Sequence, residues 1–287
     1  MLLSCAVFSR RRILPERFNM KKLTLFSLAC MVAFLSSAAD SAPKRGRLCL
    51  TFDDCHWNGW VAAMPIFEKY NAKASFFPHS ALSAGALKCM KKLHDAGHTV
   101  GPHTVHHRMA TDYVKKNGFE AFWNDEVAPQ MKAYASVGIV PEALAFPNNA
   151  SNPEINAQLV SRGIKRLRGG LPKARPHDPK GLKRSGLVPF EKLDAMYMSE
   201  AAVATNHLMR GVGIGTYYNT DIDDLVKGIR RAAANNETMV LYSHDISKKP
   251  SGIGMKTEWL EAILKAASEE GMAIVGFDDL PDFAAKK

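Results

Sequence analysis

The chain has 287 residues and 46% of them are hydrophobic, enough for one large domain or two small ones with a substantial core. Its 38 Lys and Arg residues exceed its 28 Asp and Glu residues, and the net charge of +10 suits contact with an anionic polymer. The basic residues are scattered, without a charged stripe or an interleaved aromatic platform, which argues against nucleic-acid binding.

The N-terminal part of the chain is typical of a secretory signal. Two lysines at 21–22 precede an apolar run at 23–35, and small residues suited to cleavage follow it. The apolar run is too short for a membrane span. We expect residues 1–42 to be an upstream extension and a signal peptide, with translation starting at Met20. Residues 43–287 are then expected to form a single domain that is secreted or periplasmic.

Strand and helix patterns alternate along this expected domain. The expected strands are at 47–52, 74–77, 98–101, 143–146, 164–168, 239–243 and 273–277. The expected helices are at 60–70, 84–96, 119–137, 153–162, 221–235 and 259–270. A segment rich in Gly, Pro and Lys at 169–189 is expected to be a long loop. Alternation predicts a parallel sheet, and seven or so repeats in this length predict a closed or nearly closed β/α barrel.

Polar residues follow several of the expected strands, and in a β/α barrel the chemistry lies at these C-terminal strand ends. Asp53 and Asp54 follow the first strand, His103 follows the third, and His244 follows a later one. Pro147 and Asn148 follow the fourth strand, so residues from distant parts of the sequence are expected to meet at one end of the barrel.

The residue types at these strand ends suit a divalent metal. Asp54, His103 and His107 supply three ligands, and Asp53 is a spare carboxylate that can act as a base. On an extended backbone the two carboxylates are expected to point to opposite sides. The two histidines are expected to meet on one face if their segment turns helically. His244 can donate a proton to a leaving group if its pKa lies near the working pH.

These motifs resemble those of the polysaccharide deacetylases, the NodB-homology domain of carbohydrate esterase family 4, from about residue 47 to 280. The family's Thr-Phe-Asp-Asp-Gly is similar to residues 51–55, His-Ser/Thr-x-x-His matches residues 103–107, and Leu-x-x-His is similar to residues 241–244. The resemblance implies a distorted (β/α)7-type barrel. It also implies the site residues: Asp53 as catalytic base, Asp54, His103 and His107 as metal ligands, and His244 as catalytic acid.

The activity that the resemblance implies is metal-dependent removal of N-acetyl groups from an N-acetylated sugar polymer or oligomer. One divalent metal is expected, with zinc preferred and cobalt, nickel or iron able to substitute. The candidate substrate contacts are Cys55, His56, Pro147, Asn148 and Arg168. The aromatic residues considered for stacking on sugar rings are Trp57, Trp60, Tyr217 and Tyr218, of which Trp60 is expected to be core. No nucleic-acid partner and no membrane span of the mature chain are expected.

Three departures from the family pattern leave alternatives open, and one of them is that the family's aspartate-tryptophan motif has no convincing match in this sequence. Cys55 replaces a glycine, and Ala145 stands where the family has an arginine that orients the base. Arg166 or Arg168, on the next strand, can supply that charge. The alternatives to an N-deacetylase are a metal-dependent esterase or amidase acting on another acylated glycan, and a carbohydrate-binding pseudoenzyme.

Three cysteines follow the expected signal segment. Cys49 lies within the first expected strand, which favours a buried apolar role. Cys55 can pair with Cys89, remain a free thiol near the metal, or only fill space, and the sequence does not choose among these.

Overall fold

The computed structural model describes residues 45–171, 187–281 and 283, which all belong to one compact unit. The expected signal segment and most of the expected loop at 169–189 lie outside the described residues. Among the helices of the described ranges, none combines the length and the apolar character needed to cross a membrane.

Seven parallel strands form the central sheet, in the spatial order β3-β2-β1-β8-β7-β5-β4. They are β1 (Arg47–Asp53), β2 (Ser75–Phe77), β3 (Thr99–Val100), β4 (Ala143–Ala145), β5 (Arg166–Gly170), β7 (Leu208–Gly213) and β8 (Thr238–Ser243). The backbone N–H of Ala145 donates to the carbonyl of Pro102, just after β3, at 3.2 Å. This bond links the two ends of the sheet, so the predicted seven-stranded, nearly closed barrel is confirmed.

Shorter strands extend this sheet or stand apart from it. β6 (Tyr197–Met198) pairs antiparallel with β8, and β11 (Ala273–Ile274) pairs parallel with the start of β1. β9 (Ile246–Ser247) and β10 (Met255–Lys256) form a separate two-stranded pair just after β8. This pair shapes the loop that follows His244.

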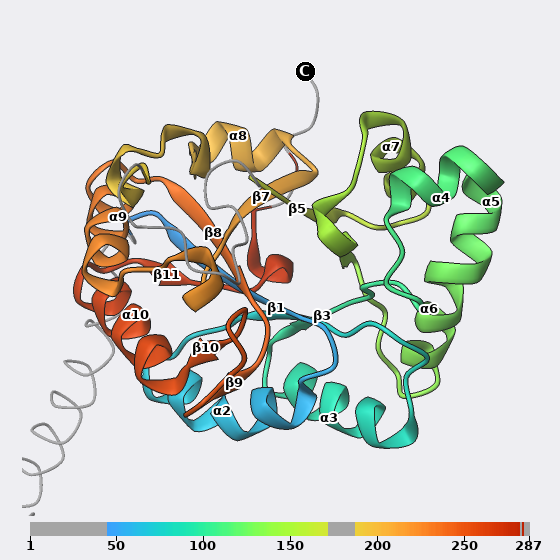
Figure 1. The fold of residues 1–287 in the computed structure, drawn as a ribbon, viewed down its shortest axis with the longest axis horizontal. Helices are drawn as coiled ribbons and strands as arrows, with labels where there is room; N and C mark the ends of the chain where they lie inside the picture. The colour runs from blue at the N-terminus through green and yellow to red at the C-terminus, as the bar shows by residue number, and fades with distance from the viewer. Residues whose placement is uncertain (1–44, 172–186, 282, 284–287) are drawn as a thin grey trace, which may run out of the picture. The chain divides into compact units, whose positions relative to one another are not determined.

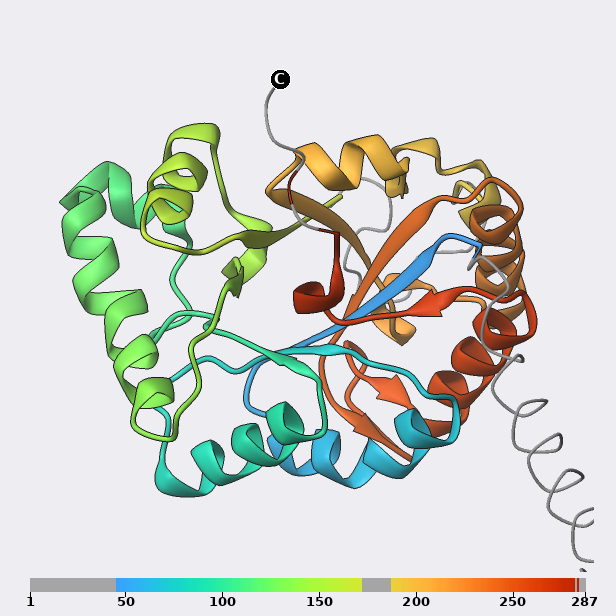
Figure 2. The ribbon, with the colours of Figure 1, turned by 180° about the vertical axis from the view of Figure 1, so that it is seen from behind.

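Helices surround the sheet (Figure 1), and the view from behind shows the same arrangement (Figure 2). They are α2 (Trp57–Lys69), α3 (Ala84–Asp95), α4 (Ala110–Asn117), α5 (Phe119–Phe122), α6 (Ala128–Ala135), α7 (Pro153–Ser161), α8 (Glu200–Thr205), α9 (Ile222–Ala234) and α10 (Thr257–Glu269). A π-helical stretch, η2 (Trp123–Val127), joins α5 to α6. Short 3₁₀ turns are η3 (Pro147–Asn149), η4 (Phe190–Lys192), η5 (Asp194–Met196), η6 (Thr216–Tyr218) and η7 (Phe277–Asp279).

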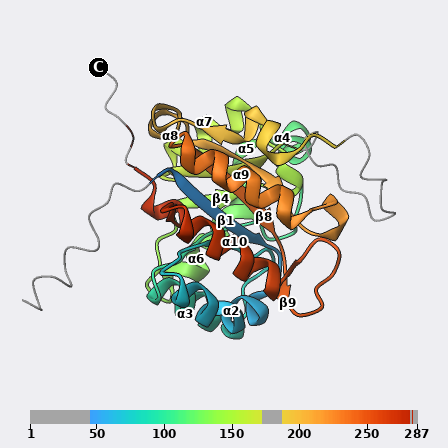
Figure 3. The same cartoon turned by 90° about the vertical axis from the view of Figure 1, so that its left-hand side faces the viewer.

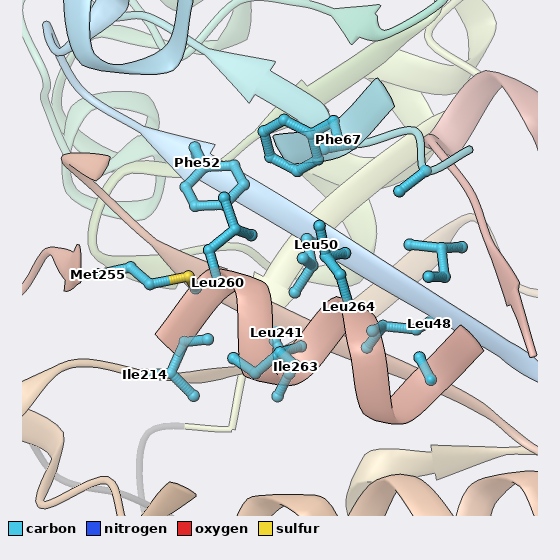
Figure 4. Close-up of a cluster of buried hydrophobic side chains, with 14 of the residues drawn as sticks. Leu48, Leu50, Phe52, Phe67, Ile214, Leu241, Met255, Leu260, Ile263 and Leu264 are labelled. Carbon is cyan, nitrogen blue, oxygen red and sulfur yellow. The ribbon is translucent and has the colours of Figure 1, made fainter. Parts of the chain in front are cut away.

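The side chains of β1 alternate between two environments. Leu48, Leu50 and Phe52 are fully buried in one cluster with side chains of α10 and α2. Figure 3 shows α9 and α10 lying over β1, and Figure 4 shows Leu260 and Leu264 of α10 against these strand residues. Full burial of such a side chain contributes about 1.5–3 kcal/mol. This layer therefore fixes where β1 ends and where its carboxylates emerge.

The opposite face of β1 belongs to a second apolar cluster. Cys49 is fully buried there with Phe77 of β2, Val240 of β8 and Met209 of β7. Burial raises the pKa of the Cys49 thiol to about 12. The thiol therefore stays protonated at neutral pH, and the predicted buried apolar role of Cys49 is confirmed.

Most predicted elements are present, with ends shifted by one to three residues. The predicted N-cap Asn152 accepts a hydrogen bond from the backbone N–H of Ile155 at 2.8 Å. The longer elements that were missed are α4, α8 and β7, and the two-residue strands β6, β9 and β10 were not predicted either. β7 lacks the expected β-branched run because Gly211 and Gly213 stand where aromatic rings pack against the strand.

The buried imidazole of His98 predicts a pH dependence of stability. Its Nδ1 accepts the backbone N–H of Ala74 at 3.1 Å, and burial lowers the pKa of His98 to about 4, with the charge of Lys73 adding to the shift. The unfolded chain, with a histidine pKa of about 6.5, binds a proton before the folded chain does as the pH falls. Stability from this group is therefore present above pH 6.5 and is lost as the pH falls towards 4, by about 3 kcal/mol.

The measurement is the free energy of unfolding of wild type and of His98→Gln at pH 7 and pH 4.5. Gln keeps an acceptor but does not titrate, so the variant is less stable at pH 7 and its deficit shrinks at pH 4.5. An unchanged deficit at both pH values would contradict this role of His98.

Candidate active site

The two carboxylates at the end of β1 face the same cavity. Asp53, 3% exposed, points into the barrel, as the alternation of the strand requires. Asp54 adopts a positive φ of 76°, and its N–H donates to the carbonyl of Phe77 at 3.2 Å. The expected extended backbone at this pair is wrong. The left-handed turn at Asp54 brings both carboxylates to one side, where both line a cavity of about 330 Å³.

The two histidines of the second motif lie on a loop after β3, not on a helical turn. Thr104 and His107 have positive φ values of 64° and 54°, so the expected helical turn is wrong. The rings of His103 and His107 nevertheless lie 5.0 Å apart between centroids. The left-handed conformations of Thr104 and His107 therefore bring the two rings together, which the sequence pattern predicted from a helical turn.

Asp54, His103 and His107 form a three-donor cluster whose ligand atoms all lie within 4.8 Å of one another. Asp54 Oδ1 lies 3.7 Å from His103 Nε2 and 3.4 Å from His107 Nε2. This oxygen is buried and has no hydrogen-bond partner, which is costly unless an additional group binds there. Two imidazoles and one carboxylate are a donor set that suits zinc. The residues present therefore fit a divalent metal.

The ring of His103 is set for binding through one nitrogen. Its Nδ1 contacts the carbonyl of Ala145 at 2.8 Å, so Nδ1 carries the proton and the lone pair of Nε2 faces Asp54. Burial, followed by the charge of Arg168, holds the pKa of His103 well below its usual value. The ring is therefore neutral at neutral pH, as a metal ligand must be.

Asp53 is paired with Arg168 rather than with Arg166. The guanidinium of Arg168, 1% exposed, donates to Asp53 Oδ2 and to Asn149 Oδ1. Asp53 Oδ1 is buried without a hydrogen-bond partner. The Arg168 guanidinium thus holds one carboxylate oxygen of Asp53, while the other oxygen is free to accept a hydrogen bond in the cavity.

The register of the sheet explains how Arg168 reaches Asp53. Ala145 of β4 and Arg168 of β5 are direct partners, so their side chains lie at the same level on neighbouring parallel strands. Arg166, two residues earlier on β5, points to the same face but deeper. It donates to the carbonyls of Val203 and Asn206 at 2.8 and 3.0 Å. An arginine is therefore supplied one strand away from the position where the family motif has it.

His244 completes the cluster from the end of β8. Its Nδ1 contacts the carbonyl of Ile253 at 3.1 Å, and its Nε2 lies 3.7 Å from Asp54 Oδ2. The indole N–H of Trp60 donates to the His244 carbonyl at 2.8 Å and anchors this strand end. The ring therefore presents Nε2 to the cavity.

The remaining cavity wall was only partly predicted. The lining residues are Asp53, Asp54, His103, His107, Asn148, Asn149, Arg168, Tyr218, Tyr242, His244 and Ile253. Of the expected substrate contacts, Asn148 and Arg168 line the cavity, whereas Cys55, His56 and Pro147 lie outside the lining. Tyr242 could have been found from the sequence because it precedes His244 by two residues on one strand and shares its face.

Asn149 and Tyr242 close the cavity beside the Asp53–Arg168 pair. Asn149 Nδ2 donates to the hydroxyl of Tyr242 at 3.2 Å, and the Arg168 guanidinium lies 4.9 Å from the centroid of the Tyr242 ring. The ring of Tyr218 packs edge-on against that of Tyr242, with centroids 5.7 Å apart. A Cβ on Gly213 would come within 2.7 Å of the Tyr218 ring, so glycine is needed there.

The three cysteines of the described residues are free thiols. Cys55 Sγ lies 3.4 Å from His79 Nε2 and within 3.8 Å of Ser80 Oγ, so it packs against the loop after β2. Cys89 contacts Asn58 instead. The possible Cys55–Cys89 disulfide is therefore not formed, and Cys55 is a thiol beside the candidate metal site.

A larger groove of about 910 Å³ near α7 and α8 contains none of the predicted site residues.

Comparisons with known proteins found a matching family model and similar folds. The polysaccharide deacetylase family model matches residues 40–166, which include both carboxylates and both histidines of the cluster. Similar solved structures include the chitin deacetylase from the fungal pathogen Colletotrichum lindemuthianum, which is 13% identical, with 83% of this chain and 89% of that chain covered and a TM-score of 0.55. A family 4 carbohydrate esterase from Streptomyces lividans is 13% identical, with coverages of 84% and 100% and a TM-score of 0.52.

A third similar structure is the Xyl-CE4 domain of a multidomain xylanase from the hindgut metagenome of Trinervitermes trinervoides. It is 16% identical, with coverages of 82% and 89% and a TM-score of 0.51. No curated protein matches the chain. At these identities the structural likeness defines the class of fold, a deacetylase-type β/α barrel. The family model, which matches residues 40–166, confirms the resemblance of the motifs to those of the polysaccharide deacetylases.

Proposed function

We propose that the protein is a metal-dependent hydrolase that removes N-acetyl groups from an N-acetylated sugar polymer or oligomer. One observation carries the proposal: Asp53, the three-donor cluster and His244 meet in one cavity at the C-terminal ends of β1, β3 and β8. A base, a metal site and an acid in one cavity are the groups that amide hydrolysis by activated water requires.

Asp54, His103 and His107 would hold the metal, through Asp54 Oδ1 and the Nε2 atoms of both rings. When bound, a zinc-type ion lowers the pKa of water from 15.7 to about 7 and polarises a carbonyl oxygen. Zinc is preferred by this donor set, and cobalt, nickel or iron can substitute.

Asp53 is assigned as the general base. Its free Oδ1 accepts a proton from water while the water oxygen forms a bond to the acetyl carbon. Arg168 holds Oδ2, which fixes the carboxylate plane and compensates its buried charge. Developing charge on the acetyl oxygen would be stabilised by the backbone N–H of Asn148, which lines the cavity.

His244 is assigned as the general acid. With Nδ1–H directed at the Ile253 carbonyl, the proton for transfer sits on Nε2, which faces the cavity. That proton passes to the amide nitrogen as the carbon–nitrogen bond breaks. The products are acetate and a free amino sugar, and the enzyme is restored when Asp53 releases its proton to solvent and His244 Nε2 takes up a proton from solvent.

The resemblance to the polysaccharide deacetylases supports an N-acetylated glycan as the substrate class. Chitin fragments, peptidoglycan and glucosamine-containing exopolysaccharide all carry the N-acetyl group that this chemistry requires. Tyr218 and Tyr242 offer aromatic surface in the cavity wall for a sugar ring.

A pseudoenzyme is disfavoured because Arg168 contacts Asp53 and replaces the arginine that the family motif has at Ala145. An acylated polymer outside the cytoplasm suits the signal peptide and the secreted or periplasmic location expected from the sequence.

The proposal is tested by acetate release from a panel of N-acetylglucosamine oligomers, peptidoglycan and acetylxylan, with the protein loaded with zinc or cobalt. We expect metal-dependent release from at least one N-acetylated substrate. Release from acetylxylan alone would identify an esterase instead. No release from any substrate, with one equivalent of metal bound, would favour a carbohydrate-binding protein.

A further inference from the structure

The loop that carries both metal-ligand histidines has an irregular backbone and must be held by its surroundings. Residues 101–109 contain no helix or strand, and two non-glycine residues, Thr104 and His107, adopt left-handed conformations. Such conformations persist only where neighbouring groups over-determine them.

A buried carboxylate on the neighbouring helix binds the middle of the loop. Glu126 is fully buried, and its Oε2 accepts the backbone N–H of His106 at 2.8 Å. Its Oε1 lies 3.0 Å from Nδ1 of the same residue and 3.4 Å from Nη1 of Arg108. The backbone carbonyl of Glu126 also accepts the N–H of Val105 at 3.0 Å. One residue thus binds the segment between the two metal-ligand histidines.

Gln130, one helical turn after Glu126, binds the start of this loop and also binds the loop that follows β2. Gln130, 1% exposed, accepts the backbone N–H of His103 through Oε1 at 3.1 Å. Its Nε2 donates to the carbonyls of Pro78 and Ser80 at 2.8 and 2.9 Å. Gln130 therefore ties the loop after β3 to the loop after β2.

A π-helical stretch places these two residues. Glu126 lies within η2, and Gln130 follows four residues later in α6, so both face the loop. A π-turn adds one residue to the helix, which rotates everything after it by about 100° relative to an uninterrupted α-helix. Phe122, just before η2, packs in the apolar cluster outside β4 and β5. Because of the π-turn, the part of the helix before η2 packs its apolar side chains in the cluster with Phe122, and the part from Glu126 onward faces the loop with polar side chains.

We propose that Glu126 and Gln130 are positioning residues that set the geometry of His103 and His107 for metal binding. The proposal deepens the proposed function and rests on its metal site. Neither residue lines the cavity, so neither is a catalytic residue. Their effect on the reaction passes through the loop backbone, as it does for hydrogen-bonding partners that orient metal ligands in other proteins.

The test compares Glu126→Gln with the control Glu120→Gln in the full chain. Glu120 lies on the same helix but is exposed and paired with Arg162. In wild type the Glu126 carboxylate faces two groups of His106, the backbone N–H and Nδ1. The Gln side chain in the variant has only one oxygen, so its NH₂ group must face one of these two groups. We expect zinc affinity, measured by competition with a chelator, to fall about 10- to 100-fold for Glu126→Gln. The control should stay within twofold of wild type.

Two further readouts separate positioning from general stability. The amides of Val105 and His106 should exchange hydrogen faster in metal-free Glu126→Gln, and kcat at saturating zinc should return close to the wild-type value with KM unchanged. A loss of unfolding stability with unchanged zinc affinity would overturn the proposal. If Glu126→Gln does not fold, Gln130→Met, which keeps length and volume, is judged by the same zinc affinity.

The outcomes also separate this inference from the proposed function. Wild-type protein that binds zinc but releases no acetate would contradict the deacetylase function, while the zinc affinity and exchange of the variants would still decide the positioning role. Wild-type protein that binds no zinc would overturn both.

Discussion

Replacing Asp53 by Asn is expected to lower kcat for acetate release by about 100- to 10,000-fold, the range that a general base contributes. The amide keeps the size of the side chain but cannot take the proton that Oδ1 is placed to accept. The metal ligands are unchanged, so the variant should still bind one equivalent of zinc. Acetate release and zinc content measured on the same samples check both parts.

The neighbouring carboxylate provides the matched comparison for this variant. Asp54→Asn removes the charge of the proposed ligand, whose Oδ1 lies 3.7 Å from His103 Nε2 and 3.4 Å from His107 Nε2, so it should lower zinc affinity first and activity as a result. Asp53→Asn with near-wild-type turnover would show that another group is the base. Asp53→Asn without zinc would show that Asp53 is itself a ligand.

Replacing Arg168 by Gln is expected to lower kcat by about 100-fold and to destabilise the fold by about 3–5 kcal/mol, the range for breaking a buried ion pair. The variant leaves Asp53 buried without its cation and removes the contact to Asn149. Arg168→Lys keeps the charge but loses the planar fork, so it should recover part of the activity. Steady-state kinetics and denaturant unfolding measure the two effects.

Arg166→Gln is the control because Arg166 is also buried, lies on the same strand and faces the same way. Arg166 donates hydrogen bonds to backbone carbonyls of Val203 and Asn206, outside the cavity lining, so the variant should lose stability but keep kcat. Equal losses of kcat in both variants would mean that the effect of Arg168 comes from barrel stability and not from its contact with Asp53.

The barrel and the core of the site were predictable because each depends on local patterns. Alternating strands and helices define the parallel barrel, and its rule that chemistry follows the strand ends brings Asp53, His103 and His244 together. The ligand chemistry of Asp54 and the two histidines is visible in the residue types alone. These features require no knowledge of which strands are neighbours.

The missed features depend on register and on backbone turns that sequence patterns do not show. The left-handed residues Asp54 and Thr104 changed how the side chains reach the cavity. The choice between Arg166 and Arg168 needed the partnership of β4 with β5, in which Ala145 faces Arg168. The buried role of Glu126 depends on a π-turn within what reads as one long helix.

The proposed function requires that the cluster of Asp54, His103 and His107 bind one metal ion and that acetate release depend on this ion. The most direct measurement is acetate release from N-acetylglucosamine oligomers by chelator-stripped protein as zinc is added stepwise. We expect negligible release without zinc, a linear rise up to one equivalent of zinc and a plateau beyond it. Release that persists in the stripped protein, or that shows no break at one equivalent, would contradict the proposed function.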